Sequence, residues 1–163
     1  PIHGKPVINI RYQSLSAGAE PIQLNTPADN DLSSTSHSNV GSAATFLSLS
    51  AGPYNDLYAL WIDSRHSEFT ESNSWVYGSR SLNKGATWSP DSPLFEQVCP
   101  CCQPDTVWSN NQLLISSRQV DAESHRDPHI HRVAADLGST GAAVRVGNGR
   151  WQLEGCQPFV ASV

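Results

Sequence analysis

Four cysteines are the residues of this sequence with the most evident chemistry. Cys99, Cys101 and Cys102 lie close together in one segment, and Cys156 lies in a later one. Their sulfur atoms could form disulfides, or as thiolates they could bind a soft metal ion such as copper or zinc. Structural zinc prefers cysteines spaced C-x2–4-C, and only Cys99 with Cys102 has that spacing. We favour disulfides, which could join Cys156 to one of the first three cysteines, whereas a bond between the adjacent Cys101 and Cys102 would be strained. A copper or zinc thiolate site and free thiols are the alternatives.

Two histidines are further candidate metal ligands. His125, His129 and His131 follow an H-x3-H-x-H pattern, in which His129 and His131 would share one face of a strand. Neutral imidazoles bind zinc and copper, so this pair is a candidate metal site. Histidines on strands also pack or face solvent without a metal. The spacing does not show whether the imidazoles meet the cysteines.

Arginines and carboxylates supply a second kind of candidate site. Arg65 and Arg118 each end an apolar run, and Arg126 lies in a polar loop. A guanidinium fork offers a carboxylate ligand two parallel, charge-assisted hydrogen bonds. A carboxylic acid beside it could donate a proton to a leaving group. The catalytic candidates are Arg65, Arg118, Arg126, Glu123 and Asp127.

Equal spacing connects several of these residues. Arg118 follows Arg65 by 53 residues, and the Cys-Gln-Pro at 156–158 follows the one at 102–104 by 54. We therefore expect Arg65 and Arg118 to occupy equivalent places in neighbouring structural repeats. The alternative role for both arginines is structural, because repeated residues often hold repeats together. They would then form salt bridges with loop carboxylates such as Asp63 or Asp127.

The segment Ser-Leu-Asn-Lys-Gly-Ala-Thr-Trp at 81–88 has the residues of a rigid turn. Asn83 can hydrogen-bond its own backbone, Gly85 permits a positive φ, and Trp88 can anchor the turn among apolar neighbours. Degenerate copies lie at 134–141 and 14–21. We predict that the turn is structural.

This segment resembles the Asp-box, or BNR repeat, of sialidase (neuraminidase) β-propellers, with Asn83 where that family usually has Asp. The resemblance implies an arginine cluster that binds the substrate carboxylate, an acid or base Asp, and a Tyr–Glu nucleophile pair. In that family the box faces away from the active site. No motif in this sequence allows a catalytic residue to be transferred one by one.

Alternating residues predict short strands throughout, and no segment has helical periodicity. The expected strands cover 7–12, 22–24, 43–49, 57–62, 75–80, 94–98, 105–109, 113–117, 129–133 and 144–153. We predict an all-β fold, a β-propeller of four-stranded antiparallel blades. Residues 1–163 form a single segment with blade boundaries near 1–25, 41–98 and 102–153, and a further blade starts at 156–163. About three blades fit the length at roughly 40–50 residues each, so the remaining blades or a second chain should complete the ring.

A meander of four strands sends its loops alternately to two ends. The turn at 81–88 should share one end with the hairpins at Asn55 and Asn110. The other end, which we call the loop face, should collect 65–74, 99–104, 118–128 and 154–158. Because binding sites of propellers gather where loops of several blades meet, we place the site on the loop face.

Composition narrows the functional classes. Ten Lys plus Arg against fifteen Asp plus Glu give a net charge of −5, which offers nothing for nucleic acid to bind. No apolar run approaches the ~18–20 residues that span a bilayer. The four cysteines and the abundant Ser, Asn and Gly favour a periplasmic or extracellular protein.

The leading hypothesis is a sialidase-like propeller that binds or acts on a glycan or small carbohydrate. Its site would be the loop face with Arg65, Arg118 and Arg126, and an enzyme of this kind would be an exo-glycosidase with an oxocarbenium-like transition state. The alternative is a non-catalytic exported propeller that binds copper, zinc or a protein partner through its cysteine-rich connector.

Overall fold

The structure is a computed structural model, and it describes residues 10–26, 44–65, 74–147, 149–152 and 159–160. These residues form strands, turns and one short 3-10 helix, η1 (Pro53–Asn55), and none of them lies in an α-helix. In this described part, no helix is long and apolar enough to cross a bilayer. The predicted all-β class is confirmed.

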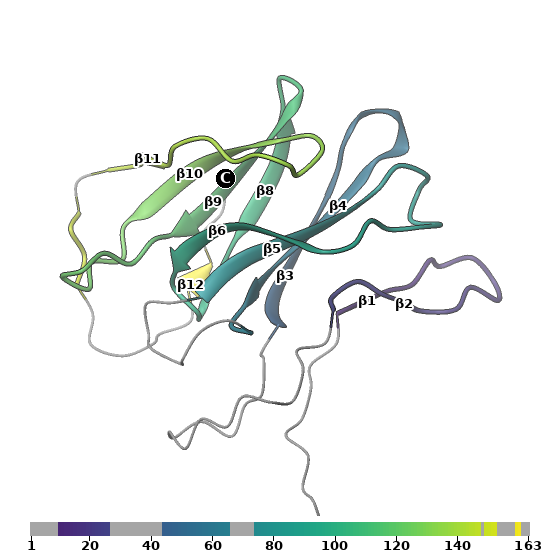
Figure 1. The fold of residues 1–163 in the computed structure, drawn as a ribbon, viewed down its shortest axis with the longest axis horizontal. Coiled ribbons are helices and arrows are strands. Elements are labelled where there is room, and N and C mark those ends of the chain that lie inside the picture. The colour runs from purple at the N-terminus through teal and green to yellow at the C-terminus, as the bar shows by residue number, and fades with distance from the viewer. Residues whose placement is uncertain (1–9, 27–43, 66–73, 148, 153–158, 161–163) are drawn as a thin grey trace, which may run out of the picture.

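Two four-stranded antiparallel sheets make up most of the fold (Figure 1). The first sheet consists of β3 (Ala44–Ala51), β4 (Leu57–Asp63), β5 (Ser74–Ser81) and β6 (Ser92–Val98), in that order. The second sheet repeats the arrangement with β8 (Asp105–Ser109), β9 (Gln112–Arg118), β10 (Pro128–Ala134) and β11 (Val144–Arg145). Each sheet is thus a meander of consecutive strands, as expected of successive propeller blades.

Two smaller pairs of strands flank these sheets. β1 (Arg11–Tyr12) pairs antiparallel with β2 (Ile22–Gln23), and this pair lies beside the first sheet (Figure 1). β7 (Cys102–Gln103) pairs in parallel with β12 (Phe159–Val160), which brings distant parts of the chain together.

The strand predictions are confirmed to within two residues at each end for β3 to β6 and β8 to β10. The strand expected at 144–153 is wrong beyond Arg145, because β11 covers only Val144–Arg145. Gly147 and Arg150 have φ angles of 88° and 42°, which an extended strand cannot contain. Of the strand expected at 7–12, residues 7–9 lie outside the described part, and β1 covers Arg11–Tyr12. The blade boundaries stay a prediction.

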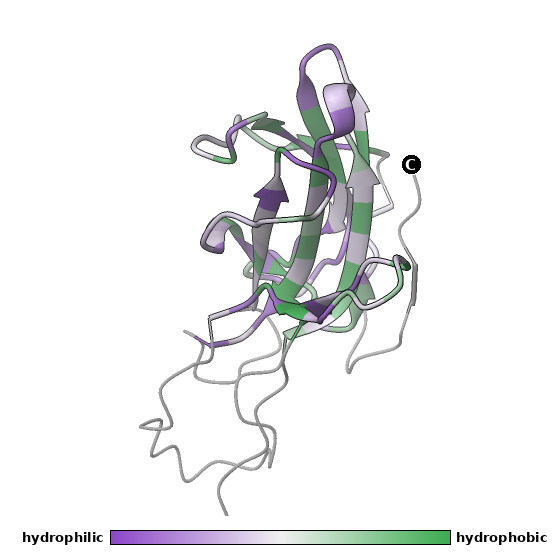
Figure 2. Cartoon of the chain, turned by 90° about the vertical axis from the view of Figure 1, so that its right-hand side faces the viewer, coloured by the Kyte–Doolittle hydropathy of each residue, from purple (hydrophilic) through white to green (hydrophobic). Residues whose placement is uncertain are grey.

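Alternation along β4 explains why the sheets pack face to face. Tyr58, Leu60 and Ile62 face the second sheet, whereas Ala59 and Trp61 face β1 and β2. All five are at most 1% exposed, so β4 is buried on both faces. Figure 2 shows the hydrophobic bands along the strands of the sheets.

The core between the two sheets is the largest of the three hydrophobic clusters among the described residues. The second sheet contributes Leu113, Ile115 and Val133, each 0% exposed. Polar bonds cross the same interface at its edges. The Tyr58 hydroxyl and an Arg80 guanidinium nitrogen both donate to the Ala135 carbonyl, at 3.2 and 2.9 Å. Apolar area drives the packing, and these directional bonds fix the rotation of one sheet against the other.

The predicted division of the loops between two ends is confirmed where the structure describes them. At one end, the Lys84 backbone N–H donates to the Asn55 carbonyl at 3.1 Å. At the other end, the Cys99 N–H donates to the Arg118 carbonyl at 2.8 Å. The 81–88 turn and the cysteine segment therefore lie at opposite ends of the sheets.

The 81–88 turn joins β5 to β6 through side-chain bonds to its own backbone. The Ser81 hydroxyl accepts from the Gly85 N–H at 2.8 Å, and the Asn83 side-chain oxygen Oδ1 accepts from the Thr87 N–H at 2.9 Å. Gly85 has a φ of 85°, and a Cβ there would collide with the ring of Tyr12. Trp88 is half-buried and contacts Tyr12, with ring centroids 5.1 Å apart.

Ile115→Ala should lower the free energy of unfolding by about 2–5 kcal/mol, because it opens a cavity in the core between the sheets. Val107→Ala is the matched control on the same sheet, since Val107 is 43% exposed, and it should stay within about 0.5 kcal/mol of the parent. Chemical denaturation of both variants measures this. Equal losses would show that the sheets do not pack as described.

Ser81→Ala should lower the free energy of unfolding by about 1–3 kcal/mol, because it leaves the buried Gly85 N–H without its acceptor. Asn83→Asp should be nearly neutral, since a carboxylate can accept the same bonds from Thr87 and Ser81. Thermal unfolding of the two variants compares them. If Asn83→Asp is the more damaging change, the bonding pattern of the turn is not the one described.

Candidate functional site

A cleft of about 180 Å³ lies on the loop face. Its walls come from the end of β6, the loop between β9 and β10, and the strands β10 and β11. We call it the loop-face cleft. Its lining residues are Gln97, Gln119, Val120, Asp121, His125, Asp127, His129 and Arg145.

The loop between β9 and β10 is held by its own hydrogen bonds. One carboxylate oxygen of Asp121 accepts from the backbone N–H groups of Glu123 and His125, at 3.0 and 2.9 Å. Val120 is buried, and its N–H donates to the Gln97 carbonyl at 2.8 Å, which ties the loop to β6. The sequence therefore builds a compact turn here that holds its polar residues at the cleft.

His125 and Asp121 form the polar pair at the rim. The His125 Nδ1 lies 2.9 Å from an Asp121 carboxylate oxygen. Desolvation acts to raise the pKa of Asp121, but the hydrogen bonds from His125 outweigh it, so this pKa lies below its ordinary value. Glu123, a predicted catalytic residue, joins this pair: its carboxylate is 3.9 Å from the His125 Nδ1 and its side chain is 66% exposed.

Asp127 and Arg145 form the charged floor of the loop-face cleft. Asp127 is 4% exposed, and its carboxylate lies 2.9 Å from an Arg145 guanidinium nitrogen. Its second oxygen accepts from the Trp151 N–H at 3.1 Å. The Arg145 side chain is 39% exposed, so part of its donor fork faces solvent.

Arg118 and Arg126 lie behind this floor. Arg126 is 2% exposed, and one guanidinium nitrogen is 3.4 Å from the Cys99 Sγ. Arg118 donates to the Arg126 carbonyl at 3.2 Å, and its guanidinium carbon lies 4.9 Å from the centre of the Trp151 ring. The structure thus brings together Arg118, Arg126 and Asp127 from the predicted set. Burial keeps Arg126 from direct contact with a ligand, so it supports the cleft from within.

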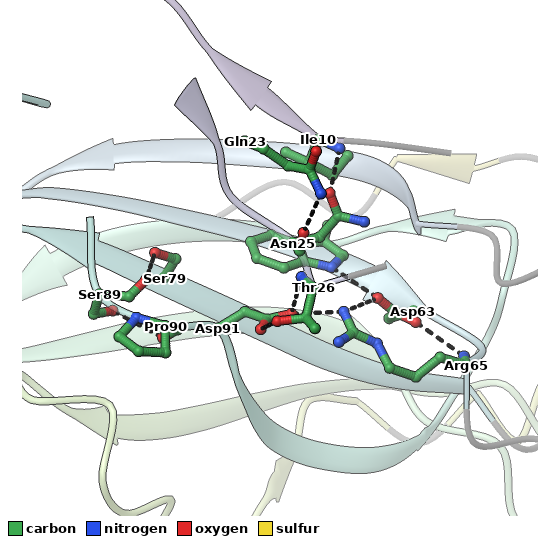
Figure 3. Close-up of polar contacts among 11 residues, drawn as sticks. Ile10, Gln23, Asn25, Thr26, Asp63, Arg65, Ser79, Ser89, Pro90 and Asp91 are labelled. Atoms are coloured by element: carbon green, nitrogen blue, oxygen red, sulfur yellow. Dashed lines mark hydrogen bonds and ion pairs between the residues drawn. The ribbon is translucent and has the colours of Figure 1, made fainter. Parts of the chain in front are cut away.

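Arg65 belongs to a different network (Figure 3). Its guanidinium lies 2.6 Å from the carboxylates of both Asp63 and Asp91, and its side chain is 9% exposed. It also stacks on Tyr77, at 4.3 Å from the ring centre. The structural alternative, a salt bridge with Asp63, is confirmed for this arginine.

The expected equivalence of Arg65 and Arg118 is wrong. Tyr77, on which Arg65 stacks, belongs to the core on the side of β1 and β2. Arg118 alternates with Ile115 and therefore leaves β9 on the face away from the first sheet. The two guanidinium groups lie on opposite outer faces of the two-sheet unit, because the 53-residue spacing does not preserve strand parity.

Hydrogen bonds lower the pKa of the Asp91 carboxyl group. Burial acts to raise its pKa, but bonds from the Thr26 hydroxyl and backbone N–H and from Arg65 outweigh it, so the pKa is lowered. The Thr26 contact links the strand pair β1 and β2 to this network (Figure 3). Asp91 and Arg65 therefore have a structural role, and most of their polar atoms are already engaged within the chain.

The predicted cysteine cluster is present in part. Cys99 and Cys102 form a disulfide, and the Cys101 Sγ lies 3.6 Å from the Cys99 Sγ. Cys156 lies outside the described residues. One disulfide is thus confirmed, within the connector.

The two histidines have separate environments. His129 lines the loop-face cleft, and its Nδ1 is 2.9 Å from the Asp127 carbonyl. His131 is 1% exposed and stacks on Phe95, with ring centroids 3.6 Å apart. Within the described ranges, groups of three or more close potential ligands are Cys99, Cys101 and Cys102, and Asp121, Glu123 and His125. Neither group contains His129 or His131, so the predicted pair is not brought to the cysteines.

Sequence reasoning missed Arg145. β11 places it directly opposite His129 in the antiparallel register, which brings a guanidinium and an imidazole to one place. A strand pairing of 129 with 145 would have revealed it.

No protein-family model matches the chain, and no curated protein matches it. Among solved structures, the chain is similar to Trypanosoma rangeli sialidase in complex with sialic acid, at 12% sequence identity and a TM-score of 0.43. The similarity covers 95% of this chain and 27% of that one. The chain therefore spans about a quarter of the length of that sialidase.

His131 should make the stability of the fold pH-dependent. Burial, with a smaller effect of His129, lowers its pKa from 6.5 to about 4. Between these values the unfolded chain binds more protons than the folded chain, so stability falls as the pH falls through this window. The slope due to His131 should reach about 1.4 kcal/mol per pH unit.

Urea unfolding at several pH values measures this slope in the parent and in His131→Leu, which should lose it. His125→Gln removes an imidazole from the loop, leaves His131 in place and should keep the slope. An unchanged slope in His131→Leu would contradict the burial of a neutral imidazole.

Proposed function

We propose that this chain is part of a sialidase-like β-propeller that binds acidic glycans in the loop-face cleft. The observation that carries the proposal is the partly exposed Arg145 guanidinium, set beside the Asp127 carboxylate and the His129 imidazole on the predicted binding face. The earlier candidates Arg118 and Arg126 contribute by supporting this cleft, and Arg65 does not contribute.

The chemistry of the cleft favours a sugar with a carboxylate. Asp127 engages one nitrogen of Arg145, and a guanidinium has five N–H donors in a planar fork. The remaining donors can form paired hydrogen bonds with a ligand carboxylate. Gln97 and Gln119 also line the cleft, and their amides can bond to sugar hydroxyls. Asp127, which also accepts a hydrogen bond from the Trp151 N–H, fixes the orientation of Arg145 before the ligand arrives.

Hydrolysis of such a glycan needs a proton donor for the leaving oxygen. Glu123 and His125 stand together at the cleft rim, and we assign proton transfer to this pair. The nucleophile and a further carboxylate-binding arginine come from other blades or from a second chain. An enzyme of this kind would be an exo-glycosidase.

The disulfide between Cys99 and Cys102 supports an oxidising compartment, the periplasm or the extracellular space. The net charge of −5 gives an acidic glycan no general attraction to the chain. Binding must therefore depend on the local guanidinium.

Arg145→Gln should weaken binding of N-acetylneuraminic acid at least tenfold, because it removes the exposed guanidinium of the cleft. Arg132→Gln is the matched control, since Arg132 is exposed on β10 and does not line the cleft. Calorimetric titration of the full chain with this sugar, and with uncharged lactose for comparison, measures the difference. Equal weakening by both variants, or equal binding of the two sugars, would overturn the proposal.

A further inference from the structure

A groove follows the seam between the two sheets, on the side where β6 lies beside β10. Its volume is about 380 Å³, and we call it the seam groove. Its floor and rim differ in polarity. Buried side chains of Leu94, Phe95 and His131 form the floor, and the more exposed Glu96, Gln97 and Gln119 stand at the rim.

The seam groove continues the loop-face cleft. Gln97 and Gln119 line both of them, so the two hollows adjoin at these amides. Along β10 the same order holds, because His129 and His131 share one face of the strand. His129 lines the cleft, and His131 lines the groove. A ligand that is bound in the cleft can therefore extend into the groove.

The combined hollow is longer than a single sugar ring. Thr140 lines the far part of the groove, and it pairs with Val133 of β10 in an isolated bridge. From His129 to Val133 the strand advances four residues, which is about 13 Å at the usual rise of a strand. A monosaccharide held by Arg145 would therefore leave the seam groove unfilled.

A β-bulge in β6 places two polar residues at the rim. The pairing of β5 with β6 leaves Glu96 and Gln97 together opposite Trp75, and Gln97 has a φ of 63°. Bulges re-aim side chains beside binding sites, and a residue other than glycine keeps a positive φ only where its surroundings enforce it. Here the Val120 N–H holds the Gln97 carbonyl at 2.8 Å. Both bulged residues therefore stay at the seam groove.

The floor of the groove contains an unsatisfied imidazole. His131 is 1% exposed, and within the described part of the chain neither of its ring nitrogens has a hydrogen-bond partner. Burial lowers its pKa, so the ring is neutral and has one N–H donor and one acceptor. A buried polar group without a partner is costly. A sugar hydroxyl both donates and accepts, so it can partner either nitrogen.

We propose that the seam groove binds neutral sugar residues that are linked to the acidic sugar in the loop-face cleft. The inference rests on the proposed function of the cleft, and it makes the ligand an acidic oligosaccharide. Among the described residues that line the groove, Glu96 is the charged one, so the groove has no cation for a second acidic sugar. The rim amides bond to hydroxyls, and the Phe95 floor takes the apolar face of a sugar ring.

The test is calorimetric titration of the full chain with N-acetylneuraminic acid and with the trisaccharide in which this sugar is linked to lactose. The parent should bind the trisaccharide at least tenfold more tightly. Ala143→Trp fills the groove with a bulky ring, so it should remove this preference and keep the affinity for the monosaccharide. Ala142→Trp is the matched control, since Ala142 is also exposed but does not line the groove. It should keep the preference.

The proposal is overturned if the parent binds the two acidic sugars equally, or if Ala143→Trp keeps the preference for the trisaccharide. Lactose that binds as tightly as the trisaccharide would reveal an independent sugar site and would also overturn it. So would a loss of folding stability in Ala143→Trp alone with equal binding of the acidic sugars, because a segment of the chain itself would then fill the groove.

Arg145→Gln separates this inference from the proposed function. It should weaken binding of both acidic sugars by the same factor, because both use the guanidinium of the cleft. If Arg145→Gln weakens both sugars but the parent has no preference between them, the cleft proposal stands and the groove proposal fails. If the parent binds neither sugar, both proposals fail.

Discussion

The burial of one sheet against the next is the constraint on which the rest of the structure depends. β4 sends alternate side chains to its two faces, and Tyr58, Leu60 and Ile62 meet Leu113 and Ile115 across the interface. This packing brings the end of β6 beside the loop that follows β9, where the Val120 N–H reaches the Gln97 carbonyl. The loop-face cleft and the Cys99–Cys102 disulfide both lie along that contact. A rotation of one sheet would separate the walls of the cleft and break the bond from the Cys99 N–H to the Arg118 carbonyl.

Buried polar groups add direction to this packing. Arg65 lies between Asp63 and Asp91, and Thr26 extends the network to the segment after β2. Arg126, also buried, joins the Cys99–Cys102 disulfide to the floor of the cleft through the Cys99 Sγ and the Trp151 carbonyl. The chain is stable only in an arrangement that pairs these buried groups, because an unpaired buried charge is strongly destabilising. They therefore select one alignment of the sheets from those that apolar packing allows.

The strands and turns could be predicted from the sequence because their signals are local. Alternation in 57–62 and 113–117, and the side-chain bonds of Ser81 and Asn83, depend on residues close in the chain. The site was harder to predict because it depends on parity and pairing across strands. The 53-residue spacing suggested equivalent positions for Arg65 and Arg118 in the two sheets, yet their side chains lie on opposite outer faces of the two-sheet unit.

Arg145 is a second residue whose place in the site depends on strand pairing and not on sequence spacing. Only the pairing of β11 with β10 places it against His129, and the expected long strand at 144–153 ended early where Gly147 and Arg150 take positive φ. His131 looked like a metal ligand by its alternation with His129, but the neighbouring sheet supplies Phe95 to cover it. The spacing of residues within one sheet does not predict which residues of the other sheet will contact them.

The most direct measurement of the central claim is a double-mutant cycle across the two sheets. Tyr58 of β4 and Trp108 of β8 stack with ring centroids 5.5 Å apart. Denaturation of Tyr58→Leu, Trp108→Leu and the double variant should give a coupling free energy of about 0.5–1.5 kcal/mol. A coupling of zero would contradict the face-to-face packing of the two sheets.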